Sequence, residues 1–141
     1  MCRDLAEIAN YAIVDDTAFR FLKVQGSYTF ILRARRQVPR RATPRKTKTI
    51  GVRIPGHPVA HALIAELDEP MLSATLQLPG EDLPLSEAEE IEEKVRNQLD
   101  LIIDAGPCGT VPSTVIDLTG AAPRVLREGK GPLAPFSVER V

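Results

Sequence analysis

Apolar and polar positions along this chain alternate with two different periods, and these periods predict short helices and strands in turn. A helical period predicts helices over 5–11, 16–24 and 59–67, and a fourth that starts at Ser86. Their expected N-terminal caps are Asp4 with Glu7 as box partner, Asp15 or Asp16, and Ser86. Runs of β-branched and aromatic residues predict strands over 28–33, 49–54, 71–76, 101–103, 114–118 and 123–127.

The helical period also predicts which side chains of each helix face the core. In the second helix these are Phe19 and Leu22, with Gly26 as the stop signal. The inward faces of the third and fourth helices are Val59, Leu63, Ile91, Val95 and Leu99. Strands and helices that interleave in this way favour an α/β layered fold, formed by a single domain over residues 1–141.

Positive charge is concentrated in one stretch, although the net charge of the whole chain is -1. Half of the 18 basic residues lie in the stretch from residue 33 to residue 53, with no acidic residue among them: Arg33, Arg35, Arg36, Arg40, Arg41, Arg45, Lys46, Lys48 and Arg53. A polycationic loop held by two strands is suited to phosphate, so a nucleotide or a nucleic acid is the predicted ligand. The alternative for such a charge run is a solvated segment without a ligand.

Composition excludes several classes of protein. No apolar run approaches the roughly 20 residues that a membrane helix needs, and the first residues lack a secretory apolar region. Cys2 and Cys108 have no C-x-x-C partner, so we predict neither a disulfide framework nor a zinc site, and a cytoplasmic location. His57 and His61 are four apart, but no third ligand accompanies them, and we predict no bound metal.

Several phrases, taken together in this order, resemble the YrdC/YciO family, the threonylcarbamoyl-AMP synthases and their relatives, and the YciO branch in particular. They cover almost the whole chain: Gly26-Ser27-Tyr28-Thr29-Phe30-Ile31-Leu32, Lys48-Thr49-Ile50-Gly51-Val52-Arg53-Ile54-Pro55, Glu69-Pro70-Met71-Leu72-Ser73-Ala74-Thr75, Pro112-Ser113-Thr114-Val115-Ile116-Asp117-Leu118-Thr119 and Leu126-Arg127-Glu128-Gly129. The resemblance implies a YrdC-like twisted mixed sheet flanked by helices, with a concave, positively charged groove.

The resemblance also implies an activity. The best-known members of the family join L-threonine, bicarbonate and ATP into threonylcarbamoyl-adenylate and release pyrophosphate, for the threonylcarbamoyladenosine modification of tRNA. ATP is then a substrate, accompanied by Mg²⁺, and tRNA or double-stranded RNA is a further partner. The alternative function is a non-catalytic RNA-binding module.

Two departures from the family pattern change this expectation. Family members carry a leading segment, ahead of the first helix predicted here, with a Lys-x-Arg motif that binds nucleotide and substrate. This sequence has no such segment. We therefore expect a fold that is incomplete at its N-terminus and a chain that is inactive alone. The Ser-Ala-Asn motif of the synthases reads Thr75-Leu76-Gln77 here. A third alternative is a product without its own function, whose exposed apolar sheet surface favours association.

The resemblance assigns two groups of site residues, and the charge run supplies a third. The nucleotide-binding residues are Thr29, Thr75 and Arg127, and the substrate-binding residues are Arg33, Ser73 and Ser113. The candidate RNA-binding residues are Arg36, Arg40, Arg41, Arg45, Lys46 and Lys48. The strand period by itself, without the resemblance, predicts that Thr29 and Arg33 share a face, because residues two and four apart on a strand point to one side.

Overall fold

The computed structural model describes residues 1–38, 48–136 and 139–140. The chain forms two compact units, one of residues 1–73 and 113–141 and the other of residues 74–112. No helix among the described residues is long and apolar enough to cross a lipid bilayer.

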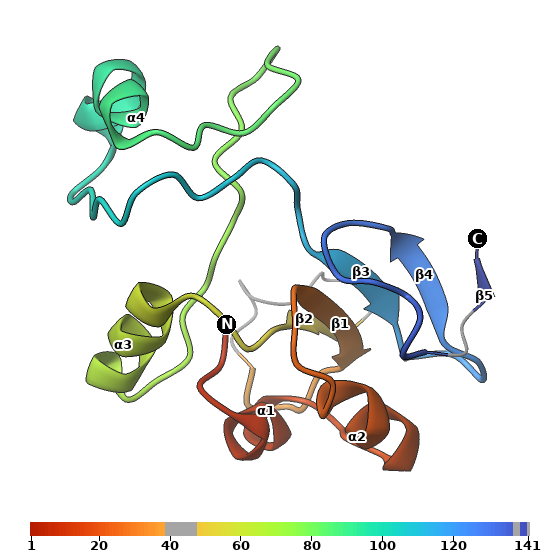
Figure 1. The fold of residues 1–141 in the computed structure, drawn as a ribbon. Coiled ribbons are helices and arrows are strands. Elements are labelled where there is room, and N and C mark those ends of the chain that lie inside the picture. The colour runs from red at the N-terminus through yellow and green to blue at the C-terminus, as the bar shows by residue number, and fades with distance from the viewer. Residues whose placement is uncertain (39–47, 137–138, 141) are drawn as a thin grey trace. The chain divides into compact units, whose positions relative to one another are not determined.

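The larger unit contains a mixed five-stranded sheet (Figure 1). Its strands are β1 (Tyr28–Arg33), β2 (Thr49–Val52), β3 (Thr114–Asp117), β4 (Arg124–Arg127) and β5 (Glu139–Arg140), in the order β2-β1-β3-β4-β5. The pairs β1/β3 and β4/β5 are parallel, and the other neighbours are antiparallel. The prediction of an α/β fold with a mixed sheet is therefore confirmed.

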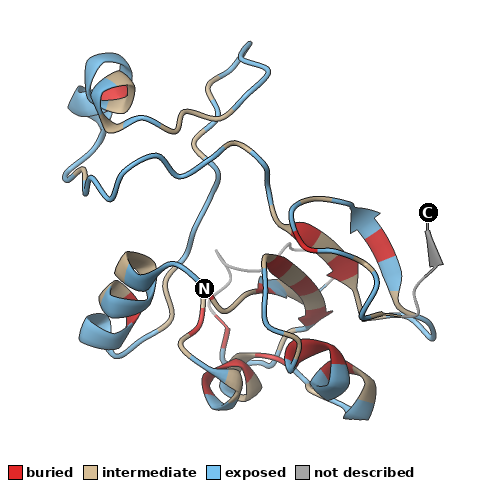
Figure 2. Cartoon of the chain, in the orientation of Figure 1, coloured by how far each residue is buried: buried red, intermediate tan, exposed pale blue. Residues whose placement is uncertain are grey.

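Side chains along β1 and β3 alternate between a buried face and a half-exposed face, which Figure 2 shows as alternating bands. Tyr28, Phe30 and Leu32 point into the core together with Ile116, which is fully buried. The intervening residues Thr29, Ile31, Arg33, Val115 and Asp117 belong to the opposite side of the sheet, which we call the polar face. Two residues of the same strand therefore lie on the same face of the sheet when they are an even number of positions apart.

Helices α1 (Leu5–Tyr11) and α2 (Asp16–Leu22) cover the apolar side of the sheet (Figure 1). Asp4 and Asp15 cap them, each accepting a backbone hydrogen bond of 2.8 Å, as predicted. The Glu7 carboxylate accepts from the N–H of Arg3, one residue before the expected cap residue. The third helix, α3, spans Pro58–Leu67 and buries Ile64 completely.

The inward face predicted for α2 is wrong for one residue. Phe19 is 47% exposed, whereas Phe21 and Leu22 are buried. Helix α2 spans Asp16–Leu22, and its buried face consists of Ala18, Phe21 and Leu22, which helical spacing puts on one side. Leu22 confirms its half of the prediction, and Gly26 lies beyond the helix end, in the turn before β1.

A cluster of aromatic rings joins the C-terminal segment to the sheet. The Phe136 ring stacks on Phe21 at 4.6 Å between centroids and meets Tyr28 edge-on at 5.1 Å. The Tyr28 hydroxyl donates to the carbonyl of Pro132 at 2.8 Å. Burial raises the pKa of this tyrosine. Thr114 donates to the Gly131 carbonyl at 2.6 Å, so both strands of the parallel pair hold this segment.

The smaller unit contains α4 (Ala88–Val95) and a 3-10 turn, η2 (Arg96–Gln98). Its helix begins after Glu87, which makes no side-chain capping bond, so the predicted cap at Ser86 is wrong. Val95 is the one predicted inward residue of this helix that is fully buried, whereas Ile91 is half-buried and Leu99 is exposed. Ion pairs from Lys94 to Glu90 and from Arg96 to Glu92 run along its exposed side.

The strands predicted over 71–76 and 101–103 are absent from the structure. Both stretches are apolar enough to suggest strands, but they have no strand neighbour in the described chain, and Leu72 and Leu101 are 67% and 73% exposed. Strand formation depends on a partner and on packing more than on intrinsic preference. Without a partner strand, an apolar run of this length remains irregular.

Candidate functional site

The polar face of the sheet brings together two hydroxyl groups that are far apart in the sequence. Thr29 lies near the start of β1, and Ser113 directly precedes β3, its parallel neighbour. Their Oγ1 and Oγ atoms are 2.8 Å apart, so one hydroxyl donates to the other. In the register of the parallel pair Thr29 lies opposite Val115, two positions after Ser113, so the two hydroxyl groups meet diagonally across the strands.

Arg127, at the end of β4, completes this group. Its Nε and Nη2 atoms donate to the Ser113 carbonyl at 3.1 and 2.9 Å, and Nη2 also reaches the Ser113 hydroxyl at 3.4 Å. Arg127 pairs with Val115 in the register of β3 and β4, which explains why its side chain reaches back to the residue before β3. Thr29, Ser113 and Arg127 together form what we call the hydroxyl cluster.

The hydroxyl cluster has the chemistry of an anion contact. A guanidinium retains donors beyond the ones that hold Ser113, and the two hydroxyl groups supply donors that can turn towards a ligand. Hydrogen bonds to a charged acceptor are shorter and roughly twice as strong as neutral ones. This arrangement suits a phosphate or a carboxylate on the polar face.

Arg33 lies at the other end of β1, on the same face as Thr29. Its Nη2 donates to the carbonyl of Thr119 at 2.9 Å, just after β3. The structure therefore confirms that Thr29 and Arg33 share a face, but it places them at opposite ends of the strand rather than in one cluster. Four strand residues span roughly 13 Å, which is longer than any single side chain reaches.

Asp117 and Thr119 form a tight turn beside Arg33. The Asp117 Oδ1 accepts from the backbone N–H of Thr119 at 2.9 Å and from its hydroxyl at 2.6 Å. Oδ2 lies 3.5 Å from Arg124. Burial acts to raise the pKa of Asp117, but the Thr119 and Arg124 hydrogen bonds outweigh it and lower this pKa below its ordinary value. Asp117 is therefore charged at neutral pH.

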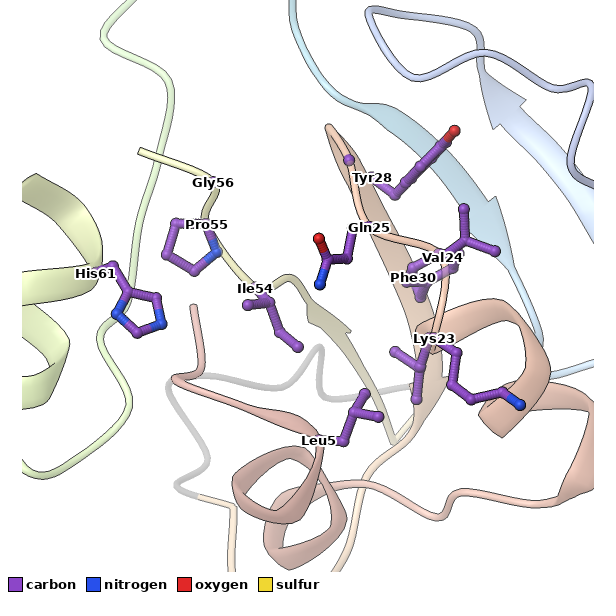
Figure 3. A pocket seen from close by; sticks show the side chains of 12 residues that line it. Leu5, Lys23, Val24, Gln25, Tyr28, Phe30, Ile54, Pro55, Gly56 and His61 are labelled. Carbon is purple, nitrogen blue, oxygen red and sulfur yellow. The ribbon is translucent and has the colours of Figure 1, made fainter. Parts of the chain in front are cut away.

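A pocket of about 370 Å³ lies on the apolar side of the sheet, not on the polar face (Figure 3). Tyr28 and Phe30 line it, together with Leu5, Ile54 and Pro55, and His61 lies at its rim. Since Thr29 alternates with Tyr28 and Phe30 along β1, its hydroxyl group points away from this pocket. The pocket is therefore separate from the hydroxyl cluster.

Besides Arg33, two further predicted site residues, Ser73 and Thr75, are not part of the hydroxyl cluster. Ser73 is exposed in an irregular segment at the end of the larger unit's first part, and Thr75 is exposed in the smaller unit. The predicted strand over 71–76, on which both residues would lie, is absent. The Thr75 carbonyl accepts instead from the N–H of Gln77 at 3.0 Å, in a local turn.

Most of the predicted RNA-binding residues lie outside the described residues, namely Arg40, Arg41, Arg45 and Lys46. Arg36 and Lys48, on either side of them, are exposed. The N–H of Ala34 donates to the Lys48 carbonyl at 2.8 Å, which closes the base of this connection between β1 and β2. RNA binding by this stretch stays a prediction.

The described residues contain no group of three or more His, Cys, Asp and Glu side chains placed to hold a metal ion. His57, part of the four-residue histidine spacing, caps α3 by accepting from the N–H of Val59 at 3.2 Å. That contact gives this histidine a structural role at the start of the helix.

Asp117, Thr119 and Arg124 are not among the site residues predicted from the sequence. A signal for the first two is visible in the sequence, because an Asp two residues before a Thr at the end of a strand is typical of a side-chain-capped turn. Arg124 could not be found in this way. Its approach to Asp117 follows from the antiparallel register of β3 and β4, which a single sequence does not reveal.

Comparison with known proteins places this chain among proteins of the same fold. The family Sua5/YciO/YrdC, whose description is "Telomere recombination", matches residues 1–129. The uncharacterized protein YciO of Escherichia coli K12 is 51% identical over 138 residues, which cover 96% of this chain and 67% of YciO. The crystal structure of E. coli YciO superimposes with a TM-score of 0.90 over the same shares of the two chains.

Pyrococcus abyssi provides more distant relatives. Its threonylcarbamoyl-AMP synthase is 36% identical over 109 residues, covering 77% of this chain and 32% of the synthase. A structure of P. abyssi Sua5 complexed with L-threonine has a TM-score of 0.84 and 30% identity, and covers 94% of this chain and 40% of that one. The chain described here belongs to the Sua5/YciO/YrdC family.

Proposed function

We propose that this protein binds an adenine nucleotide on the polar face of its sheet, as a threonylcarbamoyl-AMP synthase-like protein. In the full reaction, L-threonine, bicarbonate and ATP give threonylcarbamoyl-adenylate and pyrophosphate, for modification of tRNA. The observation that carries the proposal is the hydroxyl cluster, in which Thr29, Ser113 and Arg127 converge from three separate strands or strand ends. Family membership and the L-threonine in a Sua5 relative support the choice of substrates.

The hydroxyl cluster has one hydroxyl hydrogen left over for a ligand. Arg127 donates to the Ser113 hydroxyl oxygen, and the hydrogen bond between Thr29 and Ser113 uses the hydrogen of one of these two hydroxyl groups. The hydrogen of the other hydroxyl group can donate to a phosphate oxygen. Chains of hydrogen bonds polarise one another, and the guanidinium at one end strengthens the donor at the other.

For this chain by itself we propose nucleotide binding without synthesis of threonylcarbamoyl-adenylate. Two N–H groups of Arg127 are hydrogen-bonded to the Ser113 carbonyl. Within the hydroxyl cluster, one guanidinium that already makes these bonds is therefore the positive group that offsets the triphosphate charge. Nucleotidyl transfer depends on strong electrostatic stabilisation of the departing pyrophosphate. We therefore expect nucleotide binding without measurable pyrophosphate release.

Calorimetric titration with AMP and with ATP, each with and without Mg²⁺, tests the proposal. Removal of one hydroxyl by Thr29→Val or Ser113→Ala is expected to weaken binding about tenfold, the worth of one hydrogen bond to a charged group. The double variant is expected to lose little more than either single one, because the two hydroxyls act as a unit.

Thr17→Val is the matched control, because it removes a hydroxyl from α2 that accepts, among the described residues, a single long contact of 3.4 Å from Arg20. It should leave nucleotide affinity unchanged. Absence of AMP and ATP binding by the unaltered chain, or an equal loss in the Thr17 control, would refute the proposed function. Pyrophosphate release from ATP, L-threonine and bicarbonate by the isolated chain would refute the claim of binding without synthesis.

A further inference from the structure

A short apolar segment of the smaller unit is exposed between two acidic residues. Leu101 and Ile103 are 73% and 48% exposed. Asp100 and Asp104, on either side of them, are exposed as well. We call residues 100–104 the acidic–apolar segment. A contiguous apolar stretch that its own chain leaves in solvent is typical of a surface that contacts another molecule.

The pocket on the apolar side of the sheet has the complementary character. Tyr28, Phe30 and Pro55, which are all buried, belong to its apolar lining. Lys23, at the end of α2, and His61, in α3, lie on opposite sides of it (Figure 3). Among the described residues that line the pocket, none carries a carboxylate. An apolar hollow with nitrogen donors at its rim suits an apolar segment with acidic ends.

Net charge separates the two compact units in the same sense. Residues 74–112 contain nine acidic and two basic residues, a net charge of -7. The larger unit, residues 1–73 and 113–141, contains 16 basic and 10 acidic residues, a net charge of +6. Opposite charges steer two molecules into contact and disfavour the pairing of like surfaces. Because every copy of the chain has both surfaces, any two copies have a matching pair.

We propose that the pocket takes the acidic–apolar segment of a second copy of this chain, and that two copies exchange these contacts in a dimer. The leucine and the isoleucine of the segment enter the pocket, and its aspartates meet Lys23 and His61 at the rim. A cavity of roughly 150 Å³ holds a benzene ring, so a pocket of about 370 Å³ has room for both apolar side chains.

A second copy is the proposed occupant because a single copy leaves the acidic–apolar segment exposed. The contact uses the apolar side of the sheet, whereas the hydroxyl cluster lies on the polar face. Dimer formation therefore does not depend on the proposed nucleotide site.

Sedimentation velocity of the full chain over a range of concentrations tests the proposal, and we expect a reversible dimer. Leu101→Asn should weaken dimerisation about a hundredfold, because burial of one leucine is worth roughly tenfold and exchanged contacts are lost in pairs. This leucine is exposed in the single copy, so its replacement leaves the fold intact. Leu83→Asn is the matched control, since it replaces a leucine of the same unit that is 63% exposed and lies outside the segment. It should leave dimerisation unchanged.

A second variant alters the pocket instead of the segment. Gly56 lines the pocket, and a side chain added there meets open space. Gly56→Phe should therefore fill the pocket from its edge without strain and weaken dimerisation at least as much as Leu101→Asn.

An exchange of charges shows whether the partner is a second molecule. Lys23→Glu and the double variant Asp100→Lys/Asp104→Lys should each dimerise more weakly than the unaltered chain, because like charges then meet in both contacts. In an equimolar mixture of the two, one contact is unaltered and the other has its charges reversed. The mixture should therefore associate more strongly than either variant alone.

The proposal is overturned by equal losses in Leu101→Asn and Leu83→Asn, or by a mixture that associates no better than its components. It is also overturned by a chain that stays monomeric at every concentration reached. In that case a peptide of residues 98–106 is added, and the ring resonances of Tyr28 are followed by NMR. A shift would mean that the pocket takes the segment of its own copy, and no shift would leave the pocket to a different partner.

Discussion

Replacement of Thr114 by valine keeps the shape of a fully buried side chain and removes one hydroxyl group. That hydroxyl donates to the Gly131 carbonyl at 2.6 Å and accepts from the Gly129 N–H at 2.9 Å. Thr114 is 0% exposed, so water cannot replace it in the folded state. The variant leaves two backbone groups of the C-terminal segment without their partner.

The cost follows from the burial of the two orphaned groups. An unsatisfied buried polar group costs about 1–3 kcal/mol, and Gly129, which is half-buried, belongs at the lower end of that range. We therefore expect a loss of about 2–4 kcal/mol in the free energy of unfolding, a large share of the roughly 5–15 kcal/mol of a typical domain. For a chain of this size that corresponds to a fall in Tm of roughly 10 °C.

Urea denaturation followed by circular dichroism measures this loss, with the slope m checked for constancy. Thr114→Ser keeps the hydroxyl and removes only a methyl group, so it should cost about 1 kcal/mol. Thr17→Val, at a half-buried position of α2 with one long hydroxyl contact, should stay within about 0.5 kcal/mol of the unaltered protein. A loss below about 1 kcal/mol in Thr114→Val, or a larger loss in the serine variant, would show that the hydroxyl does not hold the C-terminal segment.

Three further outcomes follow from burial and close packing. Cys108 is exposed and Cys2 buried, so a thiol reagent should modify Cys108 at once and Cys2 only on unfolding. Burial raises the pKa of Cys2 from its ordinary 9.0 to about 11. The contribution of the protonated thiol to stability is therefore complete below pH 9 and is lost as the pH rises towards 11. Cys2→Ala should flatten that part of a curve of unfolding free energy against pH. Gly131→Ala would place a methyl group against the Tyr28 ring and 2.9 Å from the Ser27 carbonyl, and should cost about 1–3 kcal/mol in thermal unfolding, whereas Gly56→Ala, with open space around it, should be neutral.

Local chemistry is where the sequence predicts this structure best. Asp4 and Asp15 cap their helices because a carboxylate two or three residues before an N–H needs nothing from the rest of the chain. The strand over 28–33 is confirmed for a related reason, since its β-branched and aromatic residues alternate without a break. Such signals are contained within a few neighbouring residues.

Predictions that need a distant partner are less secure. The runs 71–76 and 101–103 are apolar, but the described chain offers them no neighbouring strand. Phe19 was expected inside from its spacing alone, yet it lies on the surface, where the Lys23 ammonium is 5.1 Å from its ring centre. The buried residues Ala18, Phe21 and Leu22 are three and four positions apart, so a different face of the same helix packs inward, and the sequence offers apolar residues on both faces.

The candidate site shows the same division. The resemblance pointed to Thr29, Ser113 and Arg127, which the structure brings into contact. It also pointed to Ser73 and Thr75, which lie outside that contact network. The turn beside Arg33 depends on strand register, which sets Ile31 opposite Asp117 across the parallel pair. Register is a property of two strands together, so the residues of that turn become meaningful only in the folded sheet.

The contact of Tyr28 with the Gly131–Pro132 backbone makes the tyrosine fluorescence of the protein sensitive to the position of its C-terminal segment. The sequence has two tyrosines and no tryptophan, so no indole ring absorbs the excitation light or quenches the tyrosine emission by energy transfer. One of the two fluorophores has its hydroxyl bonded to the Pro132 carbonyl and its ring against Phe136. Detachment of the last dozen residues would therefore alter the ultraviolet emission of the unlabelled molecule, and its timing could be followed in a stopped-flow instrument without any dye.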